Sequence, residues 1–408
     1  MSFLLVVAGM FAILAMAALA VDVVIIYTAR SEAQKAADAA ALAGAKVFVN
    51  SGITSGSALA NICGGGTDAS NMLAGAAAQS NNVMGIAAAV TNVTCNLADL
   101  RNPRITVTVS RNDLPTFFGR IFGRQVASVS ATATAEAFNN SGGTTQVNIG
   151  SVKPWLVPNC DPGAALDPLT GCAPPANYYF DPANNYALNN PAAYMGLQRN
   201  FNPYPDTNGP YFVIDPMNQA PQPMLCPSFS VAGCPASVGS GGYLDNIACA
   251  NQNALQCGST VQVSLLNNNP ATRATTVNGA QCLMHTAIAG NQDTFSVAGP
   301  PVVITGGTAN LNASFRNVAN ISRSDSVVNL PVFEWQGAAN TPCPGGNCTG
   351  TETVVGFLQV GINDVVTAGP NQGRFSGVIL NAVGCNPAST GNGITAGALT
   401  PVPVRLVQ

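Results

Sequence analysis

The feature that most constrains this chain is a long apolar run at its N-terminus. No charged side chain occurs from Phe3 to Val21, and the run continues to Tyr27 with Asp22 as its one charged interruption. An α-helix needs about 20 apolar residues to cross a bilayer, and the stretch from Phe3 to Val21 would extend ~28 Å as a helix. We therefore expect a transmembrane helix.

A cleavable signal peptide is the alternative interpretation of the same run. AMA at 15–17 and ALA at 18–20 resemble cleavage sites for such peptides. A signal peptide would also need a basic segment before a short apolar region. Met1 and Ser2 supply no basic residue, and the apolar run is too long. An uncleaved span is therefore the favoured prediction.

Asp22 places a charge at the edge of this apolar run, and two interpretations stay open. In the first, the span ends at Val21 and the carboxylate lies at the depth of the lipid headgroups. In the second, the carboxylate makes a polar contact with a neighbouring helix, since acidic residues inside membranes usually have partners. Both would make Asp22 a polar residue of functional interest in the membrane helix.

An alanine-rich helix is expected to continue beyond Tyr27, because alanine is the best helix former. Lys35 lies three residues from both Glu32 and Asp38, a spacing that gives weak ion-pair support. Gly44 is the expected stop. A stripe of small side chains runs along this helix: Ala33, Ala36, Ala37, Ala40 and Ala41. The stripe would allow close packing against another helix, or it would rest on the chain's own domain.

This N-terminal segment resembles a known family. The run ending in LAVDVVIIYTAR, followed by QKAADAAALAGA, is similar to the N-terminal segment of TadG-like proteins of the Tad (tight adherence, or Flp) pilus-assembly system. The resemblance is strongest over residues 10–50 and extends to residue 138. It implies a bacterial cell-envelope protein with one membrane helix. Its expected partners are the membrane, and other pilus-system subunits or copies of itself through that helix.

The start of the chain does not fit processing as a type IV prepilin. Such prepilins usually have Gly before the cleavage point and Glu five residues after it. Gly9 precedes Met10 here, but Leu14 stands at the position of that Glu. Cleavage by a prepilin peptidase is therefore not expected.

The cysteines indicate an oxidising compartment. An even number of them behind a membrane anchor favours disulfides. We therefore expect the C-terminal side outside the cytoplasm, although Arg30 and Lys35 after the span would favour a cytoplasmic flank. Nearest neighbours are the expected partners, with one pair left over: Cys63–Cys95, Cys160–Cys172, Cys226–Cys234, Cys249–Cys257, Cys343–Cys348 and Cys282–Cys385.

Composition and motifs argue against several classes of function. Charged residues make up 8 % of the chain and the net charge is −3, so no basic face for nucleic acid is expected. The chain has no C-x-x-C pair and one histidine, which argues against structural zinc. No nucleophile elbow, HExxH, P-loop or dinucleotide fingerprint occurs. His285 lies among Leu283, Met284 and Ile288, which favours a structural histidine. We expect no catalytic residue, no metal and no cofactor.

Three further patterns have weak functional interpretations. Some TadG-like proteins contain a metal-dependent adhesion domain with a D-x-S-x-S signature, but SRSDSVV at 322–328 has these residue types in the wrong spacing. DPANN at 181–185 favours a turn over a calcium site. The aromatic residues Tyr178, Tyr179 and Phe180, with further tyrosines nearby, favour core packing over a glycan-binding surface.

The expected fold class is α+β: a long N-terminal helix on a small antiparallel sheet, followed by a disulfide-rich, mainly β ectodomain. Four parts are expected: the membrane helix and its extension (1–50), a small TadG-like α+β domain (51–138), an irregular disulfide-stapled region rich in Pro, Asn and Gly (139–260) and a β-rich module (261–408). A linker-like break is expected where the second part ends, at NNSGGTTQ (139–146).

Within these parts, periodicity predicts individual elements. Alternation predicts strands at 105–110 and 126–138, and a helix is expected near 69–80. Asp113 as a cap and Pro115 in a first turn predict a short helix between the two strands. Several strands are expected after residue 260, including one at ASFRNVA (313–319).

Together these observations predict a non-enzymatic, cell-surface structural component of a Tad/Flp-type pilus system, as an anchor, an assembly factor or a minor pilus subunit. The alternative is a membrane-anchored adhesin or glycan-binding ectodomain that shares only the anchor. Saturable binding of carbohydrate by residues 140–408 would distinguish the alternative.

Overall fold

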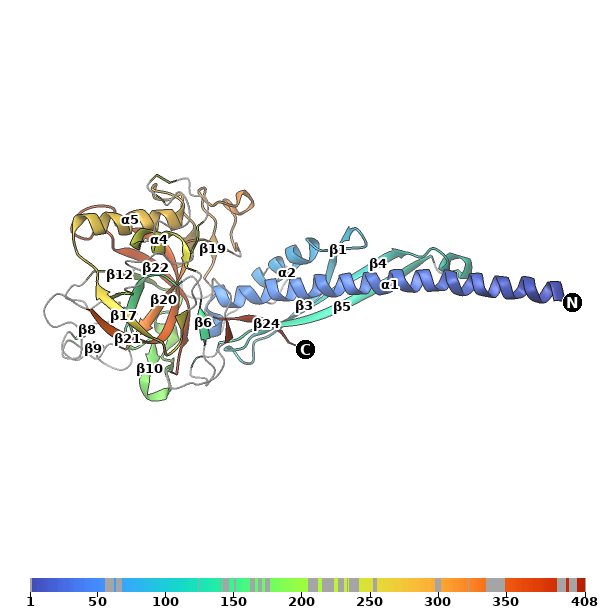
Figure 1. Cartoon of the computed structure of the whole chain (residues 1–408), viewed down its shortest axis with the longest axis horizontal. Coiled ribbons are helices and arrows are strands. Elements are labelled where there is room, and N and C mark those ends of the chain that lie inside the picture. Colours follow the sequence, from blue (N-terminus) through green and yellow to red (C-terminus); the bar gives the residue numbers. More distant parts are fainter. Residues whose placement is uncertain are drawn as a thin grey trace.

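The chain forms a long stalk and a globular head, as the computed structural model shows (Figure 1). The structure describes residues 2–55, 62–63, 68–123, 125–139, 141, 147–149, 152–161, 166–167, 171–172, 177–204, 212–214, 224–226, 231–232, 234, 242–251, 255–297, 302–321, 323–334, 349–386, 394–395 and 402–407. One helix, α1 (Ser2–Asn50), extends alone from the N-terminus and then continues along the stalk to the head. The predicted α+β class is confirmed.

The stalk consists of α1, α2 and a four-stranded antiparallel sheet in the order β24-β5-β4-β3. The alternating strands bury one face against α1, as their period of two requires: Ile105, Val107 and Val109 of β4 are fully buried. The stalk elements are α2 (Ala69–Gln79), β3 (Ala89–Asn96), β4 (Arg104–Pro115), β5 (Val126–Ala137) and β24 (Val404–Val407). The predicted helix near 69–80 and both alternating strands are confirmed.

The predicted stop of α1 at Gly44 is wrong, because the helix continues to Asn50. Gly44 instead permits close packing. A Cβ added there would lie 2.5 Å from Ile105 Cδ1 and 3.3 Å from the Ser70 carbonyl oxygen. The residue therefore serves the contact of α1 with β4 and α2, and helical backbone continues through it.

The predicted helix between the two strands is also corrected. β4 continues to Pro115, with Leu114 paired to Ala127 and Pro115 paired to Val126. Asp113 does not cap a helix but accepts a hydrogen bond from Arg111 Nε (3.0 Å). In the described part of the turn that follows, the helical element is a 3₁₀ turn, η2 (Gly119–Phe122). Pairing with β5 and the fully buried side chain of Leu114 extend the strand at the expense of the local helix signals.

The head is built on a seven-stranded sheet in the order β12-β22-β21-β17-β13-β7-β20. β20 also pairs with β21, so five strands close into a ring, and β20 and β7 are parallel. The strands are β7 (Trp155–Pro158), β12 (Gln198–Phe201), β13 (Phe212–Ile214), β17 (Thr260–Leu265), β20 (Val327–Phe333), β21 (Thr349–Val365) and β22 (Phe375–Gly384).

This sheet takes strands from both sides of residue 260, since β7, β12 and β13 precede it and the others follow. The last strand, β24, returns to the stalk and pairs with β5. The division of the chain into four parts therefore stays a prediction, and strand pairing joins the third part to the fourth.

Two helices cover one side of the head: α4 (Tyr243–Ala248) and α5 (Pro270–Met284), of which α5 lies in the part expected to be a β-rich module. Asn269 caps α5, because its side chain accepts a hydrogen bond from Thr272 N (2.8 Å), and Pro270 occupies the first turn. The strand predicted at 313–319 is wrong: that segment forms a 3₁₀ turn, η6 (Ala313–Phe315).

Short elements complete the described part of the chain. The paired strands are β1 (Asn82–Val83) with β2 (Ile86–Ala87), β8 (Leu166–Asp167) with β9 (Gly171–Cys172), β10 (Phe180–Asp181) with β11 (Ala187–Leu188), β14 (Met224–Leu225) with β15 (Ala250–Asn251), and β18 (Thr294–Phe295) with β19 (Ile304–Thr305). β6 (Val147–Ile149), β16 (Leu255–Gln256) and β23 (Ile394–Thr395) form a small sheet, and the remaining 3₁₀ turns are η1 (Ile53–Ser55), η4 (Pro182–Asn184) and η5 (Pro191–Ala193).

Four disulfides lie among the described residues. Cys63–Cys95 is present, as nearest-neighbour pairing expected. The other three are Cys226–Cys249, Cys234–Cys282 and Cys257–Cys385, so the predicted pairs 226–234, 249–257 and 282–385 are wrong. The head sheet and the packing of α4 on α5 bring these cysteines together, so distance along the sequence does not determine the pairing. The predicted bridges 160–172 and 343–348 remain predictions, because the side chain of Cys172 and residues 343 and 348 lie outside what the structure describes.

Hydrogen bonds join the stalk to the head where a linker was predicted. Asn139 Nδ2 donates to the carbonyl oxygens of Thr54 and Ala382, both at 3.0 Å. Asn381 Nδ2 donates to the Val49 carbonyl oxygen (3.0 Å) and to Thr54 Oγ1 (2.8 Å). Asn139 and Asn381 are buried, so these bonds fix the end of α1 to β22. The linker prediction is wrong for Asn139; most of 139–146 lies outside the described residues.

Candidate functional site

Asp22 joins the membrane-proximal part of α1 to the far end of the stalk sheet. Its carboxylate accepts hydrogen bonds from three consecutive backbone N–H groups, those of Phe117 (3.0 Å), Phe118 (3.1 Å) and Gly119 (2.7 Å). The Asp22 side chain is 5 % exposed. These donors belong to the turn between β4 and β5, which we call the stalk tip; the structure describes its residues 116–123 and 125.

The stalk tip has a defined local conformation. Thr116 N donates to the Gln125 carbonyl oxygen (3.4 Å) and closes the turn. Gly123 has φ of +81°, a left-handed conformation that glycine adopts without strain. The turn therefore reverses the chain and presents its N–H groups to α1. Neither sequence interpretation of Asp22 anticipated a partner from the chain's own sheet, which lies 95 residues away at its nearest member.

The alanine stripe lies inside the stalk. Its five members are fully buried, together with Ala29 and Ala45, in the core that α1 shares with α2, β4 and β5. Small side chains let the sheet approach the helix closely along its length. Of the two interpretations of this stripe, packing on the chain's own domain is what the structure contains.

A buried carboxylate holds the C-terminal strand on the stalk. Glu136 of β5 has a side chain 2 % exposed and is bonded by Arg104 Nε (2.9 Å) and Arg405 Nη2 (2.6 Å). The Arg405 guanidinium also lies over the ring of Phe138, 4.5 Å from its centroid. Two cations around one buried carboxylate satisfy its charge, so β24 is fastened beside β5.

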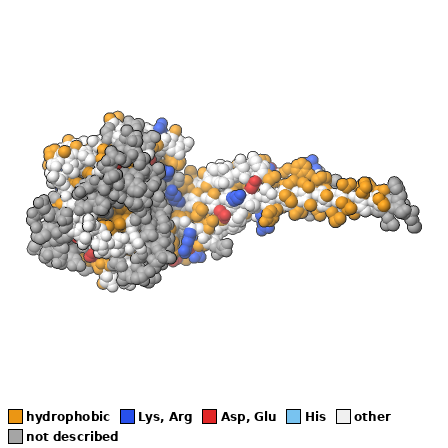
Figure 2. All heavy atoms as spheres, in the orientation of Figure 1, with side chains coloured by type: hydrophobic (Ala, Val, Ile, Leu, Met, Phe, Trp, Pro, Cys, Tyr) orange, Lys and Arg blue, Asp and Glu red, His pale blue; other side chains and the backbone are white. Residues whose placement is uncertain are grey.

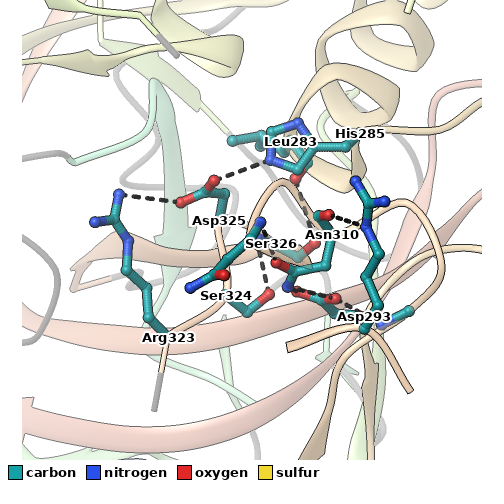
Figure 3. Close-up of polar contacts among 11 residues, drawn as sticks. Leu283, His285, Asp293, Asn310, Arg323, Ser324, Asp325 and Ser326 are labelled. Carbon is teal, nitrogen blue, oxygen red and sulfur yellow. Dashed lines mark hydrogen bonds and ion pairs between the residues drawn. The ribbon is translucent and has the colours of Figure 1, made fainter. Parts of the chain in front are cut away.

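The polar cluster around His285 lies at the C-terminal end of α5 (Figure 3). His285 caps the helix with φ of +58°, and its side chain is 5 % exposed. Its Nε2 lies 2.9 Å from Asp325 Oδ2, and Arg323 Nη2 donates to Asp325 Oδ1 (3.3 Å). The hydrogen bond from His285 and the nearby charges outweigh burial and hold the pKa of Asp325 below its usual value.

The hydroxyl groups of this cluster have structural roles. Ser326 Oγ donates to the Leu283 carbonyl oxygen (3.3 Å), and Ser324 Oγ accepts from Ser326 N (3.2 Å). Nearby, Asn310 Nδ2 donates to both oxygens of Asp293, each at 2.9 Å. These bonds tie the end of α5 to the loop before β20. The arrangement fits a structural histidine, which the sequence favoured.

Lys153 is a buried basic side chain that the sequence did not single out. Its Nζ donates to the Cys249 carbonyl oxygen (2.7 Å). Burial lowers the pKa of Lys153 to about 7, and the negative charge of Asp325 offsets only part of that effect. Residues around Lys153 in sequence give no sign of this burial, because it arises from tertiary contacts with α4. The Cys249 carbonyl at the end of α4 accepts from Lys153, and Tyr243 of α4 accepts from Trp155 of β7.

The other sequence candidates lie in structural positions. Tyr179, Phe180 and Tyr194 are buried in the head core, with the Tyr179 and Tyr194 rings edge to face at 5.0 Å. Asp181 Oδ1 accepts from Ala183 N (2.9 Å), which makes DPANN a capped turn. No group of three or more His, Cys, Asp or Glu side chains suited to a metal occurs within the described ranges.

Comparison with known proteins finds one family match, in the N-terminal segment. Residues 2–47 match the family described as putative Flp pilus-assembly TadE/G-like, so the resemblance noted in the sequence is confirmed for this segment. No curated protein and no solved structure matches the chain. In the described part of the chain, α1 is the one helix long and apolar enough to cross a membrane. The segment and the helix together indicate a membrane-associated envelope protein with a pilus-related role.

Proposed function

We propose that this chain is a non-enzymatic structural component of a Tad/Flp-type pilus system, anchored in the membrane by the first half of α1 and displaying its head outside the cytoplasm. The single observation behind this proposal is the continuity of α1. The TadE/G-like segment ends at residue 47, and the same helix continues to Asn50, where Asn381 of the head bonds the neighbouring Val49 carbonyl.

The stalk is suited to hold the head at a fixed distance from the membrane. α1 extends from Ser2 to Asn50, a length of roughly 70 Å at 1.5 Å per residue. About 28 Å of this length would lie in the bilayer, which leaves some 40 Å of helix supported by the sheet. The buried alanine stripe, the Asp22 contact and the β24 strand all stiffen that supported length.

The disulfides support a location of the head outside the cytoplasm. Three of the bridges, Cys226–Cys249, Cys234–Cys282 and Cys257–Cys385, lie in the head. Structural disulfides persist in oxidising compartments. The burial of His285 supports a non-enzymatic role, because its side chain is only 5 % exposed to solvent.

The test is deletion of the gene in its native bacterium, with complementation and electron microscopy of surface pili. We expect loss or shortening of pili, restored by the full chain. A His285→Asn variant is the matched control for catalysis, since Asn tolerates the left-handed backbone conformation. It should restore piliation. Normal pili in the deletion strain would refute the structural role, and failure of a stably produced His285→Asn chain would favour an enzyme.

A further inference from the structure

The part of α1 that extends beyond the stalk leaves its apolar side chains uncovered. Figure 2 shows hydrophobic side chains along the visible face of this part of the helix, with Lys and Arg side chains where it meets the stalk. The uncovered residues continue past Asp22. They are Val6, Met10, Phe11, Ile13, Leu14, Met16, Leu19, Val21, Val23 and Val24.

The stalk tip continues this apolar surface. Phe117 is 63 % exposed and Val126, at the start of β5, is 56 % exposed, while Phe118 is 37 % exposed. None of these three side chains belongs to the stalk core. Because Asp22 binds the backbone of Phe117 and Phe118, they are held at the level of Asp22 along the helix.

The level of Asp22 lies on the membrane side of the expected interface. Val23 and Val24 are uncovered and apolar, and Tyr27 is 76 % exposed one turn further along. Tyrosines are enriched where a helix leaves the hydrocarbon. Tyr27 lies five residues after Asp22 along α1. The stalk tip is therefore held ~7.5 Å nearer the membrane centre than the backbone of Tyr27.

The Asp22 contact also satisfies the hydrogen-bonding groups that this depth would otherwise leave without partners. Backbone N–H groups near hydrocarbon must find partners within the protein, and three N–H groups of the stalk tip donate to Asp22. The same bonds satisfy the carboxylate. Arg30 and Arg120 are exposed at the level of the tip or just beyond, where their charges favour anionic lipid headgroups.

We propose that the stalk tip is a second membrane contact: Phe117, Phe118 and Val126 insert at the boundary between the headgroups and the acyl chains of the same bilayer that α1 crosses, beside the exit of the helix, and anionic lipids are the preferred neighbours of Arg30 and Arg120. The proposal rests on the membrane anchor of the proposed function. Two contacts on one rigid stalk would fix its tilt as well as its position.

The test places a tryptophan at the tip of the full-length chain in liposomes of phosphatidylcholine and phosphatidylglycerol, with lipids brominated on the acyl chain as quenchers. Phe117→Trp and Val126→Trp are the two tip variants. Leu406→Trp is the control, because Leu406 is exposed on β24 and pairs with Ala135, ~30 Å along β5 from Val126. Emission of the native tryptophans is subtracted with the unmodified chain.

We expect brominated lipid to remove most of the added emission of both tip variants and little of that from Leu406→Trp. Flotation of the chain with liposomes but no quenching at the tip would overturn the second contact and leave the anchor standing. Blue-shifted emission without quenching would show that another protein, such as a second copy, covers the tip. A chain that does not float with liposomes would instead contradict the anchor itself.

Discussion

Replacing Asp22 with Asn is the sharpest test of how α1 holds the stalk tip. The Asp22 carboxylate receives three backbone hydrogen bonds, at 3.0, 3.1 and 2.7 Å. Phe118 N and Gly119 N donate to the same oxygen, Oδ2, so Asn with its oxygen at that position keeps these two bonds. Its amide NH₂ group then faces Phe117 N, and the bond to that donor is lost. Hydrogen bonds to charged groups contribute ~1.5–3 kcal/mol each. At the low end of that range, loss of one bond corresponds to a factor of roughly 10 in the local opening equilibrium.

Hydrogen exchange followed by mass spectrometry on the full chain in detergent micelles measures this opening. Peptides covering the stalk tip should exchange about 10 times faster in Asp22→Asn, while head peptides should be unchanged. Asp38→Asn is the matched control, since it makes the same charge change on the same helix at a carboxylate bonded by the exposed Gln34 side chain. Equal exchange at the tip in both variants would refute the role given to Asp22.

The remaining predictions concern packing, pH and crosslinking. Gly44→Ala should lower the free energy of unfolding by about 1 kcal/mol despite better helix propensity, because its Cβ would meet the buried Ile105 side chain and the Ser70 carbonyl. Gly75→Ala, in open space on α2, should raise the free energy of unfolding by ~0.5–1 kcal/mol. Urea unfolding compares the two variants, and a change of the same sign in both would contradict the packing argument. Lys153 has a pKa of about 7 when folded against an ordinary value of 10.5, so the unfolded chain binds more protons between these values and stability should rise with pH there, by at most ~1.4 kcal/mol per unit. Urea unfolding at several pH values should show a flatter profile for Lys153→Met, and an unchanged slope would contradict the burial effect. Replacing both Cys257 and Cys385 with Ser should cost about 2–5 kcal/mol, since the bridge spans 128 residues; an unchanged urea midpoint would contradict it.

The stalk was predictable from sequence because its signals are local. The apolar run and the alanine-rich continuation predict α1, and alternation predicts β4 and β5. The stripe of small residues predicted close packing, and it is the chain's own sheet that occupies it. These elements are long and periodic, so pattern and structure agree.

The contacts of Asp22 were not predictable in this way. Its donors are backbone N–H groups, which no side chain in the sequence identifies, and they come from a turn far along the chain. The short helix predicted there was wrong because pairing with β5 extends β4 through Asp113 to Pro115. Tertiary pairing overrode the cap and first-turn signals.

Three disulfide pairs were predicted wrongly and α5 was not predicted, for different reasons. Cys257 and Cys385 meet because β17 and β22 flank the same long strand, β21. The spacing of cysteines along the sequence does not reveal this strand order. α5 did have a signal, Asn269 followed by Pro270, which caps and starts the helix. Its interior is rich in threonine, a poor helix former, so the periodic signal was weak.

The most direct measurement of the central claim combines membrane fractionation of native cells with thiol labelling. The chain should pellet with membranes, resist a carbonate wash and, after denaturation without reduction, take no alkylating label at its twelve cysteines. Reduction should then make all of them reactive. That result would support an anchored chain with its head in an oxidising compartment. A chain recovered in the soluble fraction, with cysteines that label before reduction, would contradict both the anchor and the outward orientation.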